Sequence, residues 1–158
     1  MRMSEEAKIE EARCCCGQIS IRLVGGPKQV HTCSCDYCQR RTGSIMQFSA
    51  WYTEDQFVTR TGEPKHYQSP NNPGADYMFC PNCGSTVYWE MPGLDSLYGA
   101  RLYGVAVGGF ADPDYPRPTV ESWSSKRHRW LDDIGSDEIY AEFPTAIMEV
   151  LQNAELGD

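Results

Sequence analysis

Cysteine spacing is the feature that most constrains this chain. All eight cysteines fall into three short clusters, with at most two residues between neighbours inside each cluster. The clusters are Cys14-Cys15-Cys16, Cys33-Ser34-Cys35-Asp36-Tyr37-Cys38 and Cys80-Pro81-Asn82-Cys83. Such bunching suits the binding of one ion by several sulfurs better than the cross-linking of distant segments. We therefore expect metal binding, with disulfides, or free core or redox cysteines, as the alternatives.

The number of sulfurs favours two metal ions. Structural zinc sites prefer four tetrahedral sulfur or nitrogen ligands. The turn from Cys80 to Cys83 offers two sulfurs and needs two more from another cluster. Pairing it with the first cluster completes a four-sulfur site and leaves the second cluster with three sulfurs and an open position. Catalytic zinc sites have that arrangement, whereas a single four-cysteine zinc would leave the C-x-C-x-x-C idle.

Length and charge narrow the class of protein. A chain of 158 residues suits one domain, expected over residues 1–158. The charged N-terminus lacks the apolar stretch of a secretory signal, and no apolar run approaches the ~20 residues of a membrane span. We therefore expect a cytoplasmic protein. The net charge of −8 disfavours nucleic acid and anionic membranes as partners, because both are bound through Lys and Arg.

The hydrophobic pattern predicts a mainly β fold, a single zinc-bound domain of twisted antiparallel sheets with one short C-terminal helix. Alternating apolar residues or turn signals predict strands at 19–23, 30–35, 44–51, 57–61, 65–68, 77–79, 86–90 and 102–107. Residues 1–13 are expected to be a frayed or short helical lead-in. The C-terminal helix is expected over about 144–152, where Ala146, Ile147, Val150 and Leu151 share one face.

The three motifs in this order resemble the glutathione-dependent formaldehyde-activating enzyme family, whose domain centromere protein V shares. The resemblance rests on the cysteine motifs, the second extended to Gln39-Arg40-Arg41-Thr42-Gly43 and the third running from Phe79 to Ser85, and spans about 13–131. It implies a β-rich fold with one structural zinc and a second zinc at the open site. The implied structural ligands are Cys14, Cys16, Cys80 and Cys83, and those of the second zinc are Cys33, Cys35 and Cys38.

The resemblance implies a carbon–sulfur lyase reaction, in which glutathione sulfur adds to formaldehyde to give S-(hydroxymethyl)glutathione. Three thiolates leave a zinc centre with a net charge of −1, which suits a thiol arriving as the fourth ligand better than the activation of water. The favoured hypothesis is an enzyme that joins a small aldehyde to a thiol such as glutathione, with Cys33, Cys35 and Cys38 as the catalytic site. The alternatives are a non-catalytic thiol carrier and a zinc-stabilised interaction module.

Charged neighbours of the second cluster suggest how a substrate would be held. Arg40 and Arg41 follow Cys38 directly, so they could bind a carboxylate of glutathione or instead compensate the thiolate charge. His31 shares a strand face with Cys33, and we weigh it as a fourth ligand, a supporting hydrogen-bond donor or an ordinary strand histidine.

Three further features have a functional and a plain structural interpretation. The basic run at 126–129 could attract an anionic ligand, but a solvated turn is favoured. Trp51, Trp123 and Trp130 are expected in the core rather than on a substrate platform. Cys15 is expected to point away from Cys14 and Cys16, because adjacent side chains of an extended chain oppose each other.

Overall fold

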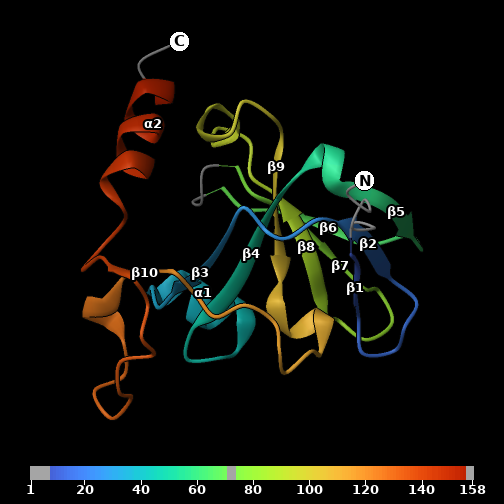
Figure 1. The fold of residues 1–158 in the computed structure, drawn as a ribbon, viewed down its shortest axis with the longest axis horizontal. Coiled ribbons are helices and arrows are strands. Elements are labelled where there is room, and N and C mark those ends of the chain that lie inside the picture. The colour runs from blue at the N-terminus through green and yellow to red at the C-terminus, as the bar shows by residue number, and fades with distance from the viewer. Residues whose placement is uncertain (1–7, 71–73, 156–158) are drawn as a thin grey trace, which may run out of the picture.

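Two β-sheets pack against each other in the computed structural model, which describes residues 8–70 and 74–155 (Figure 1). The small sheet has the order β1-β2-β5 and the large sheet the order β11-β10-β3-β4-β9-β8-β7-β6. The strands are β1 (Ile9–Arg13), β2 (Ser20–Val24), β3 (Gln29–Cys33), β4 (Gln47–Thr53), β5 (Phe57–Thr61), β6 (Lys65–Gln68), β7 (Asp76–Phe79), β8 (Thr86–Glu90), β9 (Leu102–Ala106), β10 (Val120–Ser122) and β11 (Glu138–Ile139). The predicted mainly β class is confirmed.

The predicted strands are found with small shifts at their ends, but the N-terminal prediction was wrong. Residues 9–13 form β1 rather than a helical lead-in, and residues 1–7 lie outside the described part of the chain. In β1, Ala12 lies opposite Ile21 of β2, and both side chains are fully buried. Pairing with β2 thus gives this Glu-rich segment a buried position that its own composition did not indicate.

Two features of the large sheet were not predicted. Helix α1 (Asp36–Thr42) follows β3, with Cys35 as its N-cap and Gly43 ending it in the left-handed conformation at φ 69°. Strand β10 pairs in parallel with both β3 and β11, so the sheets are not wholly antiparallel. Strands of two and three residues are too short to show an alternating pattern, so sequence analysis missed β10 and β11.

The large sheet buries apolar side chains on both faces. In β4, Tyr52 joins the cluster shared with the small sheet, together with Ile21 and Leu23 of β2. The neighbouring Trp51 joins a second cluster on the opposite face, with Trp89 and other side chains. This alternation follows from the period-2 geometry of a strand. The large sheet is therefore a central layer with a separate apolar cluster on each side.

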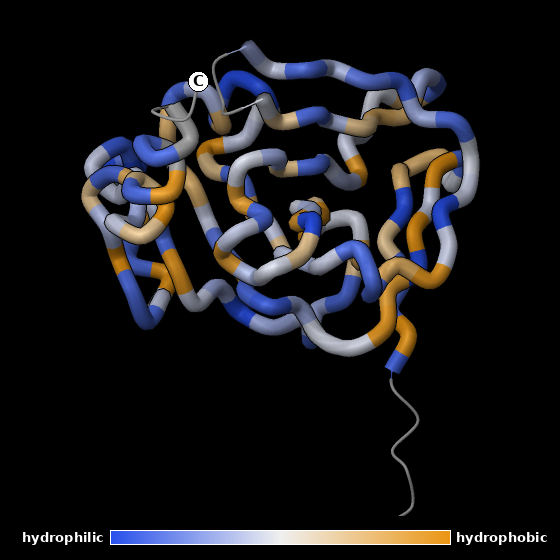
Figure 2. Tube along the Cα trace, turned by 90° about the horizontal axis from the view of Figure 1, so that it is seen from above, coloured by the Kyte–Doolittle hydropathy of each residue, from blue (hydrophilic) through white to orange (hydrophobic). Residues whose placement is uncertain are grey.

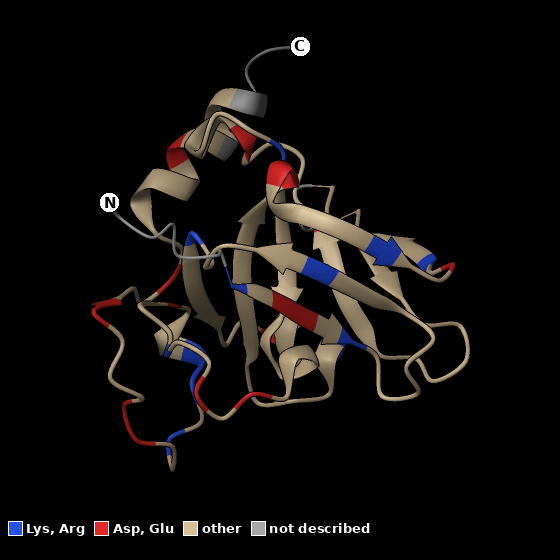
Figure 3. Ribbon diagram, turned by 45° about the vertical axis from the view of Figure 1, so that its right-hand side comes forward, with Lys and Arg blue, Asp and Glu red and all other residues tan. Residues whose placement is uncertain are grey.

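The C-terminal segment covers part of the second apolar cluster, the one that contains Trp51 and Trp89. Helix α2 (Thr145–Glu155) stands beside the sheets in two perpendicular views (Figures 1 and 2). Its Ile147 and Val150 pack against the second cluster. The helix was expected over about 144–152, so it runs slightly further than predicted. Acidic residues mark the loops that precede it (Figure 3). No helix among the described residues is long and apolar enough to cross a membrane.

Candidate functional site

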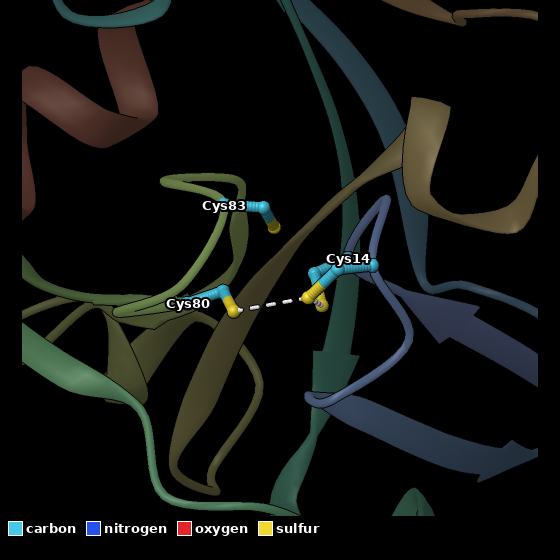
Figure 4. Close-up of side chains that lie close together, drawn as sticks. Cys14, Cys80 and Cys83 are labelled. Carbon is cyan, nitrogen blue, oxygen red and sulfur yellow. Dashed lines mark hydrogen bonds between the residues drawn. The ribbon is translucent and has the colours of Figure 1, made fainter.

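One cysteine cluster joins the two sheets. Cys14 and Cys16 lie on the loop between β1 and β2 of the small sheet, whereas Cys80 and Cys83 lie on the turn between β7 and β8 of the large sheet. Figure 4 shows Cys80 and Cys83 directed toward the loop that carries Cys14. The structure therefore brings together the four cysteines that the family resemblance implied, across two elements far apart in the chain.

The distances between these sulfurs fit a tetrahedral metal site. The Sγ atom of Cys16 lies 3.6 Å from those of Cys14 and Cys80, and all four sulfurs lie within 4.8 Å of one another. A disulfide would require about 2.05 Å. Four sulfurs at the usual zinc–sulfur distance of about 2.3 Å would be separated by about 3.8 Å. The cluster is thus suited to one metal ion, and none of its cysteines forms a disulfide.

Polar groups surround this cluster and favour negative charge on its sulfurs. The backbone N–H of Ile19 donates to Cys14 Sγ over 3.2 Å. The hydroxyl of Ser85 lies 3.3 Å from Cys83 Sγ and is the main reason that the pKa of Cys83 falls to about 5. Burial raises the pKa of Cys80 to about 11. A cation would stabilise all four thiolates together, including those of the two buried residues, Cys14 and Cys80.

Cys15 does not belong to the cluster. Its side chain is exposed and is not one of the four grouped sulfurs. Its backbone N–H donates to Ser85 Oγ over 3.3 Å, and a side-chain hydrogen bond from Cys15 contributes to the lowered pKa of Cys83. The absence of Cys15 from the group of four agrees with its expected role as a cysteine that is not a metal ligand, whereas its orientation relative to Cys14 and Cys16 stays a prediction. Cys15 therefore offers a natural control for experiments on the other cysteines.

The three-cysteine cluster is built from the end of β3 and the start of α1. Cys33 is the last residue of β3, Cys35 caps α1 and Cys38 lies in its first turn. The three sulfurs lie within 4.8 Å of one another, and Cys35 Sγ accepts the backbone N–H of Cys38 over 3.3 Å. No fourth Cys, His, Asp or Glu ligand joins them in the described parts of the chain. The cluster can therefore supply three ligands.

The charge balance of these three thiols also favours a cation. Hydrogen bonds from the thiols of Cys33 and Cys38 hold the pKa of Cys35 far below its ordinary value. The same contacts raise the pKa of Cys33 and of Cys38, because a second negative charge would face the first. Three thiolates at this spacing require a positive ion to share. Sulfur ligands select zinc among the common divalent ions, so the donor set fits zinc.

The three-cysteine cluster opens onto a pocket. The pocket lies on the face of the large sheet that carries the apolar cluster of Trp51 and Trp89. The pocket is lined by His31, Cys33, Cys35, Cys38, Gln47, Trp51, Tyr77, Trp89, Met91, Leu94, Phe143 and Ile147. Sequence analysis considered a functional role only for the cysteines, His31 and Trp51 among these. The others come from β4, from β7, from β8 and the turn after it, and from the C-terminal segment, and cross-strand pairing places Tyr77 opposite Trp89.

His31 lies in the wall of this pocket rather than among the sulfurs. Its Nε2 lies 2.6 Å from Ser122 Oγ, and its ring lies 6.3 Å from that of Trp51. Burial lowers its pKa to about 4, so the imidazole is neutral near pH 7. The hypothesis that His31 is a fourth ligand finds no support in this placement. Its neutral ring can instead donate a hydrogen bond to a bound molecule or accept one from it.

The structure separates the two arginines that sequence analysis considered together. Arg40 is exposed, whereas the Arg41 guanidinium lies 4.1 Å from the Tyr77 ring centre and 5.3 Å from that of Trp89. Arg41 also donates to the side-chain carbonyl of Gln47. Tyr77, Trp89 and Gln47 all line the pocket. Arg41 is thus the arginine that contacts side chains lining the pocket, and helix geometry directs Arg40 elsewhere.

The basic run at 126–129 is largely occupied by structural contacts. Arg127 forms two 2.8 Å hydrogen bonds to the fully buried Glu121, Lys126 pairs with Asp36, and His128 approaches Gln39. The favoured reading as a solvated turn was incomplete, because three of the four residues brace β10 and α1.

The expectation that all three tryptophans lie in the core was wrong for Trp130, whose side chain is 69% exposed. Trp51 is buried but lines the pocket, and Trp123 packs edge-on against Phe143 with ring centres 5.7 Å apart. Trp51 therefore belongs to the apolar cluster and also lines the pocket, two roles that sequence analysis considered as alternatives.

Comparison with protein-family models identifies a family that covers most of the chain. A family model described as glutathione-dependent formaldehyde-activating enzyme matches residues 9–126, close to the predicted span of about 13–131. The matched segment contains all eight cysteines and ends before Phe143 and Ile147. No curated protein matches the chain.

Proposed function

Because this chain belongs to the glutathione-dependent formaldehyde-activating enzyme family, we propose that it joins a small aldehyde to a thiol such as glutathione. The sulfur–carbon bond forms as the thiol adds to the carbonyl carbon, and the thiol proton ends on the carbonyl oxygen. The reverse reaction is a carbon–sulfur lyase step. The proposed site is Cys33, Cys35 and Cys38 with one zinc ion, while Cys14, Cys16, Cys80 and Cys83 hold a second, structural zinc.

The observation that carries this proposal is the position of the three-cysteine cluster on a pocket. Three ligands and a free approach match the pattern of zinc sites that bind a substrate directly. A zinc ion held there would bind the thiol as a fourth ligand, deprotonate it and keep its sulfur nucleophilic. Four ligands, by contrast, leave no position for substrate at the other cluster.

The protein's own residues would bind and orient the reactants. Trp51, Trp89 and their apolar neighbours exclude water, which strengthens polar interactions inside the pocket. Neutral His31, held by Ser122, can donate or accept one hydrogen bond at the carbonyl or hydroxyl oxygen. Arg41, braced by Tyr77 and Gln47, supplies positive charge for a glutathione carboxylate in a protein whose net charge of −8 would otherwise repel it.

Calorimetric titration of the zinc-loaded protein with glutathione tests the proposal. We expect saturable binding at millimolar or lower thiol, followed by glutathione-dependent loss of free formaldehyde in a separate assay. Binding without turnover would contradict the enzyme and favour the non-catalytic thiol carrier. No binding at millimolar thiol would contradict both the enzyme and the thiol carrier, and would favour the zinc-stabilised interaction module.

Cys35→Ser and Cys15→Ser form the matched pair of variants for this experiment. The first removes a sulfur of the pocket cluster and should abolish binding, whereas the second removes an exposed thiol outside both clusters and should leave binding unchanged. Equal losses in both variants would contradict the assignment of the site.

A further inference from the structure

The pocket beside the three-cysteine cluster is mainly apolar. Six apolar side chains form its wall beyond the sulfurs: Trp51, Trp89, Met91, Leu94, Phe143 and Ile147. Its polar groups other than the cysteines are confined to His31, Gln47 and Tyr77, and no Lys or Arg of the described residues lines it. Such a wall suits a hydrocarbon group, and the charges of glutathione would lie beyond it, at residues such as Arg41 that do not line the pocket.

The pocket is larger than formaldehyde requires. Its cavity volume is about 60 Å³, which at 10–15 Å³ for each water-sized group leaves room for roughly four to six such groups. Formaldehyde carries only hydrogen on its carbonyl carbon and would leave most of this apolar wall facing water. A substituent of a few carbon atoms on that carbon would instead displace this water and contact the wall.

Part of the wall comes from outside the segment that the family match covers. Phe143 and Ile147 follow the matched residues 9–126. Phe143 is held edge-on by Trp123, and Ile147 packs against the apolar cluster that contains Trp51 and Trp89. The C-terminal segment therefore completes this chain's pocket with two side chains fixed by packing.

We propose that these six side chains form a subsite for an apolar substituent on the carbon that becomes bonded to sulfur. The substrate is then an aldehyde larger than formaldehyde, with a short aliphatic or aromatic side chain, and Phe143 and Ile147 limit its length. The proposal rests on the proposed function for the identity of the aldehyde, but the apolar subsite can be tested without thiol or turnover.

Two ligand series separate the subsite from the reaction. Straight-chain primary alcohols of one to six carbons probe the pocket alone in the zinc-loaded full-length protein, with binding followed by tryptophan fluorescence, because Trp51 and Trp89 line the site. Glutathione and its S-alkyl derivatives of one to six carbons then probe the joined substrate. In both series we expect affinity to rise about fourfold for each added methylene until the pocket is full.

Variants of α2 and the segment before it locate the effect. Phe143→Ala should weaken the dependence on chain length, and Ile147→Phe, which adds bulk, should shorten the longest chain accepted. Met148→Ala is the matched control, because its side chain lies on the same helix, is 38% exposed and does not line the pocket. It should behave like the wild-type protein.

The outcomes distinguish the two proposals. Alcohol affinity that does not depend on chain length, or a dependence that both pocket variants leave unchanged, overturns the subsite. A chain-length dependence for alcohols, with no binding by glutathione or by any of its derivatives, supports the subsite and contradicts glutathione as the thiol. Tighter binding of glutathione itself, with equal affinity for all the S-alkyl derivatives, supports the thiol site and overturns the apolar subsite, because only glutathione retains a thiol.

Discussion

The two cysteine clusters use the same local motif in opposite surroundings. Each contains a C-x-x-C, yet the four-cysteine cluster links the two sheets, while the three-cysteine cluster sits beside a pocket lined by aromatic side chains. The first draws ligands from segments 64 residues apart, and the second takes all three from six consecutive residues. A cross-linking site stabilises the fold, whereas a local site can lose its ion without separating distant segments.

The largest expected effect comes from breaking the cross-link. Cys80→Ser should unfold the protein, because a structural zinc contributes about 10–16 kcal/mol of apparent binding free energy, comparable to the whole stability of a domain at about 5–15 kcal/mol. Far-UV circular dichroism during heating would measure this. Cys15→Ser should melt like wild type, and a Cys80→Ser variant that does the same would contradict the structural role.

A smaller loss is expected where β10 is braced beside the three-cysteine cluster. Arg127→Ala should lower the free energy of unfolding by about 3–5 kcal/mol, since it leaves the buried Glu121 carboxylate, 0% exposed, without its partner. Arg117→Ala removes an exposed pair with Asp137 and should cost about 0–1 kcal/mol. Urea unfolding compares the two, and equal losses would show that burial does not distinguish these ion pairs.

Removal of the local site should change metal content more than stability. Cys35→Ser should reduce bound zinc from about two ions to about one per chain while the protein keeps its cooperative unfolding, because the cross-link between the sheets remains. Elemental analysis alongside thermal melting tests this. If Cys35→Ser loses both ions, or aggregates as Cys80→Ser should, the three-cysteine site is also needed for folding. That result would contradict the division into a structural site and a local site.

The smallest effect concerns the two arginines and involves binding alone. Arg41→Ala should weaken glutathione binding about tenfold, the value of one hydrogen bond to a charged group, and should flatten its dependence on salt. Arg40→Ala should change affinity by about twofold at most, because exposed charges are screened. Calorimetry at low and high salt measures both, and a stronger effect of Arg40 would reverse the assignment made from the structure.

The sequence by itself determined the features whose cause is local. The spacing of the cysteines predicted two metal sites, and apolar segments bounded by turn signals or flanking a cysteine turn predicted strands such as β5, β6 and β8 with the bounds observed. The three ordered motifs also identified the family. In each case the signal lies within a few neighbouring residues, because ligand spacing and side-chain alternation are properties of a short stretch of chain.

Only the tertiary structure decided what surrounds those motifs. The contact of His31 with Ser122 joins residues 91 positions apart, and the pocket gathers Trp89 and Phe143 from separate segments. β1 was missed because its burial depends on pairing with β2, and α1 because a seven-residue helix held by its caps has little periodic pattern. Pairing and packing between distant segments decide burial and electrostatic surroundings, and no local pattern records which segments will meet.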